Sequence, residues 1–467
     1  MGLSPARRLA FKVVKRVREK DSFATEALQS AVARAKLSAR DKAFATRLAY
    51  GTISVRGTLD ELVATELSRP NDTPDELKDA LALAAYELFF EGTEPYIVVD
   101  QGVELAYFAM KSKTYRGLAN AVLRRLSEAR DELFPGGNPL QDVQAAARYY
   151  GHPLWLAELL REQYGAELAN EVMAINNEPA PLYVAHLPFF ESEHQSLTTL
   201  GKFGVAWSET GIEGAFLIED RAKFWGLDPD YRRSFVAMDL AAQQVVAFCK
   251  AHPDQNILEV GSGRGTKSLA LAAAARRLGG PAKITGVDLY EFKTKVAQKT
   301  AQGYHAQECD FLTLDVTKRS AIDRLREHCA TEGASEVEFD TVLVDAPCSG
   351  LGTLRRAVDK RWKLKPEDIE ALSKLGLNML KWASACVRPG GALIYATCTI
   401  SREENQDVVQ AFLGLPEGQD FAIEATLLDE LAPAFAEAIT SEGYLNALPQ
   451  SEGPDGHFAV RLRRTER

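Results

Sequence analysis

The fold class follows from one stretch, Asn256-Ile257-Leu258-Glu259-Val260-Gly261-Ser262-Gly263-Arg264-Gly265-Thr266-Lys267. Its first half is a short apolar run, which is typical of a buried parallel strand. Its second half carries a glycine at every other position from Gly261 to Gly265. Glycines there let the backbone turn tightly and approach a ligand closely. The stretch therefore predicts the first strand and the ligand-binding turn of an open α/β sheet.

Four further segments repeat the strand pattern, and helical stretches lie between them. They are Lys283–Asp288, Asp340–Asp345, Ala392–Ala396 and His457–Leu462. Alternation of this kind favours a doubly wound, mostly parallel sheet. We expect an α/β domain over residues 234–467, with ligands bound where its strands end.

The remainder of the chain has a different pattern. Residues 5–130 carry apolar side chains at helical spacing, with breaks at Ser38–Asp41, Arg69–Asp72 and Gly92–Pro95. This predicts an all-helical bundle over residues 1–133, in which Ser38 caps a helix with Asp41 as its partner. A linker around 134–139 follows. Over residues 145–233 we expect a small mixed α/β region that contacts RNA.

Composition narrows the class of protein. The chain has 467 residues, 46% of them apolar, and a formal net charge of -10. Residues 1–58, however, contain 13 Lys and Arg but only 4 Asp and Glu. This excess of positive charge is a plausible electrostatic footprint for RNA or simply a solvated helix face. There is no signal-peptide core and no apolar run of about 20 residues. We expect a cytoplasmic monomer with reduced thiols and no membrane partner.

Two cysteines follow apolar, β-branched runs and therefore fall at strand ends. Cys348 lies in Val342-Leu343-Val344-Asp345-Ala346-Pro347-Cys348-Ser349-Gly350, and Cys398 in Leu393-Ile394-Tyr395-Ala396-Thr397-Cys398-Thr399-Ile400. Two thiols in one cleft are consistent with nucleophilic chemistry, a metal pair or a disulfide. No Cys-x-x-Cys occurs and the histidines are scattered, so we expect no metal. A cytoplasmic disulfide is disfavoured, and nucleophilic catalysis remains.

The glycine turn indicates the cofactor. An acidic residue two positions before the first glycine, with Gly-x-Gly-x-Gly spacing, resembles the S-adenosylmethionine site of class I methyltransferases. A dinucleotide oxidoreductase is the rival, whereas a P-loop lacks its Gly-Lys-Ser/Thr signature. Asp288 ends the next strand, where it can accept hydrogen bonds from a ribose, and Asp310 is a candidate near the adenine. The predicted cofactor residues are Glu259, Gly261, Ser262, Gly263, Arg264, Gly265, Lys267, Asp288, Asp310 and Asp345.

The N-terminal stretch resembles the NusB-like RNA-binding domain. The resemblance is carried by Ala6-Arg7-Arg8-Leu9-Ala10, Arg40-Asp41-Lys42-Ala43-Phe44-Ala45, Leu48-Ala49-Tyr50-Gly51-Thr52 and Asn120-Ala121-Val122-Leu123-Arg124-Arg125-Leu126. It implies RNA contact through the first helix, where Arg7, Arg8 and Lys12 lie, together with Lys15 and Arg16.

The rest of the chain resembles the bacterial Sun/Fmu-like RNA cytosine-C5 methyltransferases. The matching residues are Asp345-Ala346-Pro347-Cys348-Ser349-Gly350-Leu351-Gly352-Thr353-Leu354-Arg355-Arg356, Trp362-Lys363, 389–400, Glu403-Glu404-Asn405 and Asp455-Gly456-His457-Phe458. The resemblance implies that Cys398 is the nucleophile, that Cys348 helps to release the product, and that Asp345 contacts the target base. Lys267 is the candidate cation beside the thiolate. The family's usual Cys-Ala-Ala-Pro-Gly-Gly-Lys-Thr is replaced here by the turn at Gly261–Gly265, and its Arg-Val-Asn by Tyr183-Val184-Ala185.

The same resemblance implies the substrate, small-subunit (16S) ribosomal RNA. Basic side chains follow the Asp345–Gly350 loop, and we expect Arg355, Arg356 and Lys363, with Lys360 and Arg361, to contact phosphates near the target. Trp362 would either stack on a base or pack in the protein. The alternative function is a non-catalytic RNA-binding or ribosome-assembly factor, which the altered first-strand turn would fit.

Overall fold

The computed structural model describes residues 2–20, 23–134, 137–318, 320–329, 338–426 and 430–466. Contacts within the chain divide it into two compact units, each described here by itself. The first contains residues 1–179 and 354–366, and the second residues 180–353 and 367–467. The three-part division expected from the sequence stays a prediction, and Pro135 and Gly136 of the expected linker lie outside the described residues.

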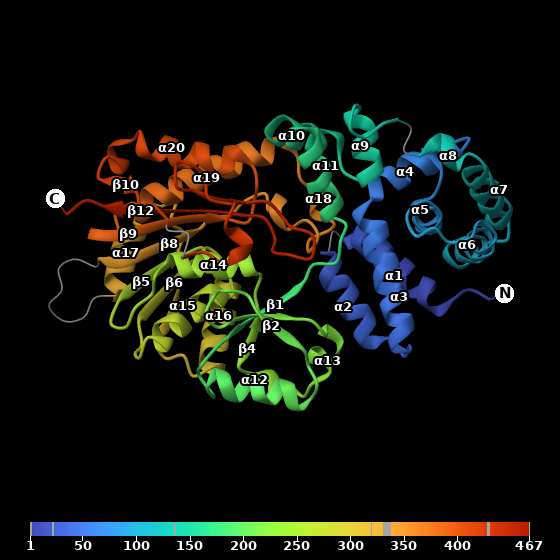
Figure 1. Cartoon of the computed structure of the whole chain (residues 1–467). Helices are drawn as coiled ribbons and strands as arrows, with labels where there is room; N and C mark the ends of the chain where they lie inside the picture. Colours follow the sequence, from blue (N-terminus) through green and yellow to red (C-terminus); the bar gives the residue numbers. More distant parts are fainter. Residues whose placement is uncertain are drawn as a thin grey trace. The chain divides into compact units, whose positions relative to one another are not determined.

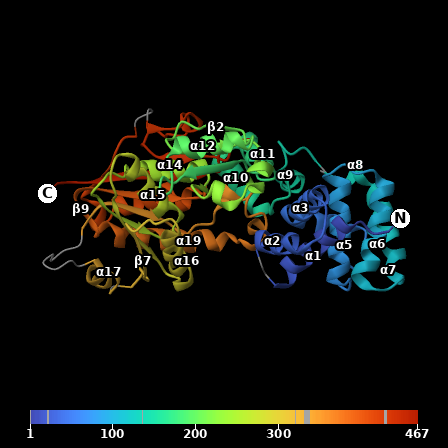
Figure 2. The same cartoon turned by 90° about the horizontal axis from the view of Figure 1, so that it is seen from below.

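The first unit is helical (Figure 1). Its helices are α1 (Pro5–Lys20), α2 (Ala24–Arg34), α3 (Ala39–Ser54), α4 (Arg56–Thr65), α5 (Asp75–Phe89), α6 (Pro95–Met110), α7 (Thr114–Glu128), α8 (Arg130–Leu133), α9 (Val143–Tyr150), α10 (Leu154–Tyr164), α11 (Ala166–Ile175) and α18 (Lys360–Lys363). Helices α5, α6 and α7 lie side by side in Figures 1 and 2. The breaks expected at 69–72 and 92–95 separate α4, α5 and α6.

Local signals in this unit act as the sequence predicts. The Ser38 hydroxyl accepts a hydrogen bond from the Asp41 backbone N–H at 3.1 Å and so caps α3. Helix α5 is buried along most of its length, because apolar residues surround Leu81 and Leu83 on more than one face. The apolar cores that include α5 join helices α1 to α7.

The second unit is built on a sheet of eight strands. In spatial order it runs β10 (Phe421–Ile423), β12 (His457–Arg464), β9 (Val387–Thr397), β8 (Phe339–Asp345), β5 (Asn256–Val260), β6 (Lys283–Asp288) and β7 (Cys309–Thr313), with β11 (Leu445–Ala447) paired to β12. The five strands from β9 to β7 are parallel, and β12 joins them antiparallel. The mostly parallel sheet is confirmed, while β7, β10 and β11 were not anticipated.

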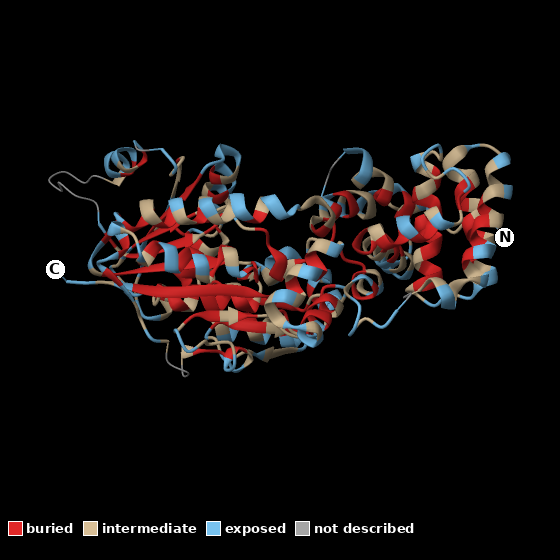
Figure 3. Cartoon of the chain, turned by 90° about the horizontal axis from the view of Figure 1, so that it is seen from above, coloured by how far each residue is buried: buried red, intermediate tan, exposed pale blue. Residues whose placement is uncertain are grey.

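Helices cover both faces of this sheet. One core contains Ile257, Leu343 and Ile394 together with residues of α14 (Leu240–Phe248) and α15 (Thr266–Arg277). The other contains their neighbours Leu258 and Val344 together with residues of α17 (Ala321–Cys329), α19 (Pro366–Ser384) and α20 (Gln406–Leu413). Alternate side chains of a strand point to opposite faces, so each strand contributes to both cores. Figure 3 shows the central strands as buried along their length.

A four-stranded antiparallel sheet completes the second unit. Its order is β2 (Trp207–Glu209), β3 (Ala215–Ile218), β1 (Leu182–His186) and β4 (Phe235–Ala237), with α12 (Glu193–Lys202) and α13 (Arg221–Gly226) beside it. Helix α16 (Glu291–Gly303) connects β6 to β7. None of the helices that the structure describes is long and apolar enough to cross a membrane.

Candidate active site

The turn after β5 forms the first wall of the site. Gly261, Gly263 and Gly265 all have positive φ, at 87°, 57° and 81°. A Cβ on Gly261 would meet the Asp345 carbonyl oxygen at 2.3 Å, so the first glycine is required by the close approach of β8. The Ser262 hydroxyl oxygen is buried and has no hydrogen-bond partner among the described residues. A glycine cradle with an orphaned hydroxyl fits a polar ligand such as S-adenosylmethionine.

Glu259 lies under this turn and is 1% exposed. Burial raises the pKa of its carboxyl group to about 8, and the charge of Asp345 acts in the same direction. The Ser268 hydroxyl donates a hydrogen bond to Glu259 and partly offsets that shift. A carboxyl group of this kind holds a proton at neutral pH and ionises readily when a cation binds beside it.

Asp288 organises the second wall, at the end of β6. Its carboxylate accepts hydrogen bonds from the Gly263 backbone N–H at 3.0 Å and the Tyr290 backbone N–H at 2.9 Å, and Lys293 lies 3.4 Å away. The predicted position beside the glycine turn is therefore what the structure shows. Arg264, also predicted here, has an exposed side chain.

The structure does not bring Asp310 to this edge. In the β6–β7 register Asp310 pairs with Thr285, whereas Thr313 pairs with Asp288. Asp310 thus lies three residues before the carboxyl end of β7, roughly 10 Å back along the strand. Its carboxylate is bound instead by His328 at 2.7 Å. The sequence placed Asp310 at the cofactor because β7 was not recognised as a strand.

Lys267 and Asp345 form an ion pair in the centre of the site. Lys267 Nζ lies 2.6 Å from Asp345 Oδ2, which joins the start of α15 to the end of β8. Burial alone would lower the pKa of Lys267, but the charge and hydrogen bond of Asp345 raise it above its usual value. A negative charge on Cys398 would raise it further, which places the ammonium within electrostatic reach of that sulfur.

The two predicted thiols are adjacent. Cys348 Sγ and Cys398 Sγ lie 3.5 Å apart, one after β8 and the other after β9. Both strands run in parallel, so their ends meet at one edge of the sheet. Both cysteines are partly exposed, whereas Cys249, Cys309 and Cys386 are buried. No group of three or more His, Cys, Asp or Glu among the described residues is placed to hold a metal ion.

The loop that carries Cys348 is held by a buried carboxylate, that of Glu404. In the sequence this residue stands out only as part of the motif Glu403-Glu404-Asn405. Glu404 is 1% exposed and accepts hydrogen bonds from the Ser349 backbone N–H at 2.7 Å and the Ser349 hydroxyl at 2.5 Å. The Ser349 hydroxyl also lies 2.7 Å from that of Thr399, which follows Cys398. The network therefore fixes both cysteine-bearing loops to each other. Nothing in the residue types alone distinguishes Glu404 from Glu403, which is less buried.

The predicted RNA-contacting residues of α1 differ in environment. Arg7 donates hydrogen bonds to the buried Glu87, and its side chain is only 12% exposed. Arg8 and Lys12 are exposed. Both line a hollow of about 480 Å³ whose other basic residues are Arg16, Arg34 and Lys36. Arg8 and Lys12 are therefore accessible to a phosphate, and Arg7 chiefly holds the bundle together.

The basic segment after the Cys348 loop is largely built into the helical unit. Arg361 is 0% exposed and donates hydrogen bonds to the backbone oxygens of Gly151 and Asn176, at 3.2 and 2.9 Å. The Trp362 indole N–H donates to the Ser54 backbone oxygen at 2.9 Å. A phosphate contact by Arg361, as expected from the sequence, is contradicted by this burial, and Trp362 packs in the protein.

The other members of that segment are mixed. Arg355 is 5% exposed, whereas Arg356 is exposed. Lys363 lies 3.1 Å from Asp359 and 5.2 Å from the centre of the Phe23 ring. Of the five residues predicted to contact RNA in this segment, Arg356 is the most exposed, and the RNA contacts of the residues other than Arg361 stay a prediction.

Comparison with known proteins identifies the chain. The family model described as 16S rRNA methyltransferase RsmB/F matches residues 246–463, and the NusB family model matches residues 4–128. A Mycobacterium tuberculosis protein whose name gives it only as a methyltransferase is 30% identical over 99% of this chain and 97% of its own length. The Escherichia coli (strain 536) ribosomal RNA small subunit methyltransferase B is 27% identical, over 91% of each chain.

Solved structures agree on the fold. The crystal structure of PH0851 matches with a TM-score of 0.77 at 19% identity, covering 99% of this chain and 100% of its own. NSun6 from Pyrococcus horikoshii, solved with SFG, matches with a TM-score of 0.56 at 16% identity, covering 68% of this chain and 99% of its own.

Fold and site together define an S-adenosylmethionine-dependent methyltransferase that carries a NusB-like helical domain. The glycine turn, Asp288 and the buried Glu259 would hold the cofactor, which supplies an electrophilic methyl group when it is bound. The chain belongs to the RsmB/F family of ribosomal RNA methyltransferases. This membership decides against both the dinucleotide oxidoreductase and the non-catalytic assembly factor.

Proposed function

We propose that the chain methylates C5 of a cytosine in small-subunit ribosomal RNA through a covalent bond between Cys398 and C6 of the base. The observation that carries the proposal is the pair of sulfurs, 3.5 Å apart, beside the Lys267–Asp345 ion pair. Carbon-5 of cytosine is a poor nucleophile, so direct methylation is slow. A covalent intermediate replaces that difficult step by easier ones.

The first step is attack by Cys398. Its thiolate adds to C6, the C5=C6 double bond opens, and the electron pair makes C5 nucleophilic. As C5 takes the methyl group, the bond from the methyl carbon to the sulfonium sulfur would break and a neutral thioether would leave. Lys267 favours the thiolate, because its ammonium is held in the site by Asp345 and lies within electrostatic reach of Cys398. Asp345 contacts the exocyclic edge of the base and orients it.

The second step is release. The proton on C5 leaves to a base at the site, its electron pair restores the C5=C6 bond, and the bond from C6 to Cys398 breaks to return the thiolate. Cys348 Sγ lies 3.5 Å from the departing sulfur, and the loop that carries it is held by Ser349 and Glu404. We assign the proton transfer to Cys348 assisted by Asp345.

Recognition of the RNA involves both units. The target base must be unpaired or turned out of its helix to reach Cys398. Arg8 and Lys12 on α1, and Arg356 and Lys363 after the Cys348 loop, supply positive charge for phosphates. These contacts position the strand, whereas Asp345 distinguishes the base.

The nucleophile is tested by Cys398→Ala. We expect methyl incorporation into ribosomal RNA from labelled cofactor to fall by about a thousandfold or more, because the covalent route is lost. Cys329→Ser is the matched control, since this cysteine is also partly exposed but lies in α17, outside the site. Undiminished incorporation by Cys398→Ala would contradict the assignment.

The release step is tested by Cys348→Ala. We expect the RNA to remain attached to Cys398, which gives a slowly migrating band on a denaturing gel that disappears on nuclease treatment. The double variant with Cys398→Ala should show no such band. A Cys348→Ala protein that turns over normally without any adduct would show that Cys348 does not release the product.

A further inference from the structure

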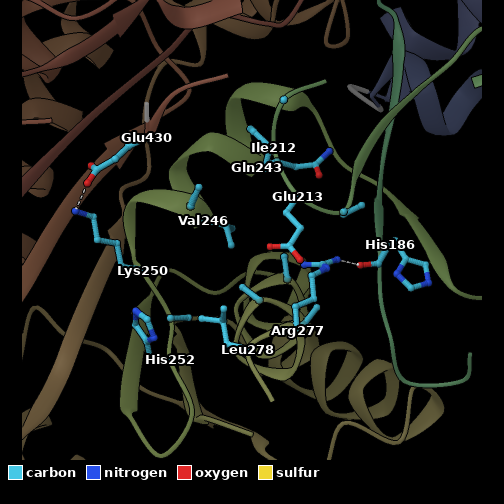
Figure 4. A pocket seen from close by; sticks show the side chains of 18 residues that line it. His186, Ile212, Glu213, Gln243, Val246, Lys250, His252, Arg277, Leu278 and Glu430 are labelled. Carbon is cyan, nitrogen blue, oxygen red and sulfur yellow. Dashed lines mark hydrogen bonds and ion pairs between the residues drawn. The ribbon is translucent and has the colours of Figure 1, made fainter. Parts of the chain in front are cut away.

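The second unit contains a cavity that the proposed chemistry does not use. It has a volume of about 350 Å³ and lies between α14, α15 and the Gly211–Gly214 loop that joins β2 to β3 (Figure 4). Neither catalytic thiol, nor Lys267 or Asp345, lines it. This volume is at the lower end of the range for small-molecule pockets.

The cavity exists because the helix faces around it carry small side chains. On α15 the lining positions are Ala270, Ala273, Ala274 and Arg277, which recur at helical spacing on one face. Val246 and Ala247 of α14 also line the cavity. The walls are therefore mostly apolar, and Arg277 is the one charged side chain on the α15 face.

The guanidinium of Arg277 lines this mostly apolar cavity, and not all of its N–H groups have hydrogen-bond partners among the described residues. Its Nη2 donates a hydrogen bond to the His186 backbone oxygen, which is its only hydrogen bond among the described residues. Its Nε is buried and has no partner. Gly214 lets the guanidinium lie against the loop, because a Cβ there would meet Nη2 at 2.0 Å.

The carboxylates whose charge acts on Arg277 do not form an ion pair with it among the described residues. Burial lowers its pKa, and the carboxylates of Glu193 and Glu213 oppose that shift from a distance. No carboxylate among the described residues comes within ion-pair distance of it. A buried cation is stabilised most by an anion that it can bind with two parallel hydrogen bonds.

The opposite end of the cavity is different. Lys250 is paired there with Glu430 at 2.6 Å and with Glu424 at 3.5 Å, so its charge is compensated by the protein. Figure 4 shows Lys250 and Glu430 on one side of the cavity, Arg277 on the other, and Val246 between them. A ligand that fits has one anionic group, directed at Arg277, and an apolar body.

We propose that this cavity binds a small monocarboxylate with a compact apolar body. The carboxylate accepts hydrogen bonds from Arg277, and the body packs between Ala247, Ala273 and Ala274. Glu213 lines the same cavity, beyond ion-pair distance of Arg277, and disfavours a ligand with a second negative charge. The site is independent of the chemistry at Cys398.

The probe for the experiment is sodium benzoate, and benzamide serves as its neutral isostere. Binding to the full-length protein is measured by titration with saturation-transfer difference NMR at constant ionic strength. We expect saturable binding of benzoate and at least tenfold weaker binding of benzamide. Equal binding of the two compounds, or no saturable benzoate binding up to its solubility limit, would overturn the proposal.

Three variants locate the binding. Arg277→Gln should weaken benzoate at least tenfold, and Arg277→Lys should retain part of the affinity. Ala274→Leu fills the cavity from a partly exposed position and should abolish binding without removing any charge. Arg276→Gln is the matched control, because its partner Glu308 lies outside the cavity. Benzoate binding that survives both Arg277→Gln and Ala274→Leu would also overturn the proposal.

Discussion

Two consecutive segments, Asp345–Thr353 and Leu354–Pro366, share one stretch of the family resemblance but belong to different units. The first carries few charges, and its polar groups are held by Glu404 in the methyltransferase unit. The second is rich in Arg and Lys, yet its central residue Arg361 is completely buried in the helical unit. The centre of the segment with the charges is therefore structural, whereas the segment with few charges is the one to which we assign the chemistry.

The physical reason lies in what surrounds Arg361. Gly151 and Asn176 are the C-cap residues that follow α9 and α11, where backbone carbonyl oxygens lack partners within the helix. The Arg361 guanidinium binds both, and it also donates to the Asn177 side chain at 2.9 Å. A cation at two helix C-termini is stabilised by both helix dipoles. These carbonyl oxygens thus take the place of the carboxylate partner that a buried arginine usually has.

Among the changes that test this comparison of the two segments, the largest effect is expected at Glu404. Glu404→Ala leaves the Ser349 N–H and hydroxyl without their buried acceptor and releases the Cys348 loop, so we expect methyl transfer to fall about a hundredfold and the free energy of unfolding by about 3 kcal/mol. Radiolabel incorporation and urea unfolding measure the two. Glu403→Ala, which alters the neighbouring and more exposed carboxylate, is the control. Equal losses in both variants would remove the special role of Glu404.

The next effect concerns Arg361. Arg361→Met leaves two helix-terminal carbonyl oxygens buried without a donor, and we expect the free energy of unfolding to fall by about 3 kcal/mol. Arg361→Lys should recover part of this, since an ammonium can bind one carbonyl but not the whole set. Urea unfolding followed by circular dichroism reports the change. If Arg361→Met instead weakens RNA binding at full stability, the comparison between the two segments is wrong.

Glu404 and Arg361 also show which features of the structure could not be predicted from the sequence. The five predicted strands, the glycine turn and the two thiols follow from patterns that are local in the chain, such as apolar runs and glycine spacing. Burial of Arg361 depends on helices about 200 residues earlier, and the loop contact of Glu404 depends on a strand about 55 residues earlier. The structure does not bring Asp310 to the edge where the cofactor was expected, for a related reason. Its position depends on the register of β7 against its neighbour β6.

A smaller effect on stability is expected when pH changes the charge of Glu259, whose pKa depends in part on Asp345. Burial and the charge of Asp345 raise the pKa of Glu259 to about 8, above the ordinary value of 4.5. Between these values the folded chain holds a proton that the unfolded chain has lost, so stability falls as pH rises through this window. The slope contributed by Glu259 is at most about 1.4 kcal/mol per pH unit. Urea unfolding of Glu259→Gln at pH 6 and pH 8 should lack this slope, and an unchanged slope would assign it to other groups.

The smallest effect is expected at Arg356, the exposed arginine of the Leu354–Pro366 segment. Arg356→Ala should change the free energy of unfolding by no more than about 0.5 kcal/mol. It should weaken RNA binding a few-fold and reduce the slope of log affinity against log salt by about 1, because one phosphate contact is lost. Lys374→Ala, an exposed cation paired with Glu370 on α19, is the control. An unchanged salt slope in Arg356→Ala would mean that Arg356 contributes no phosphate contact, and the positive charge for the RNA would then have to come from Lys363 or from residues such as Arg8 and Lys12 on α1.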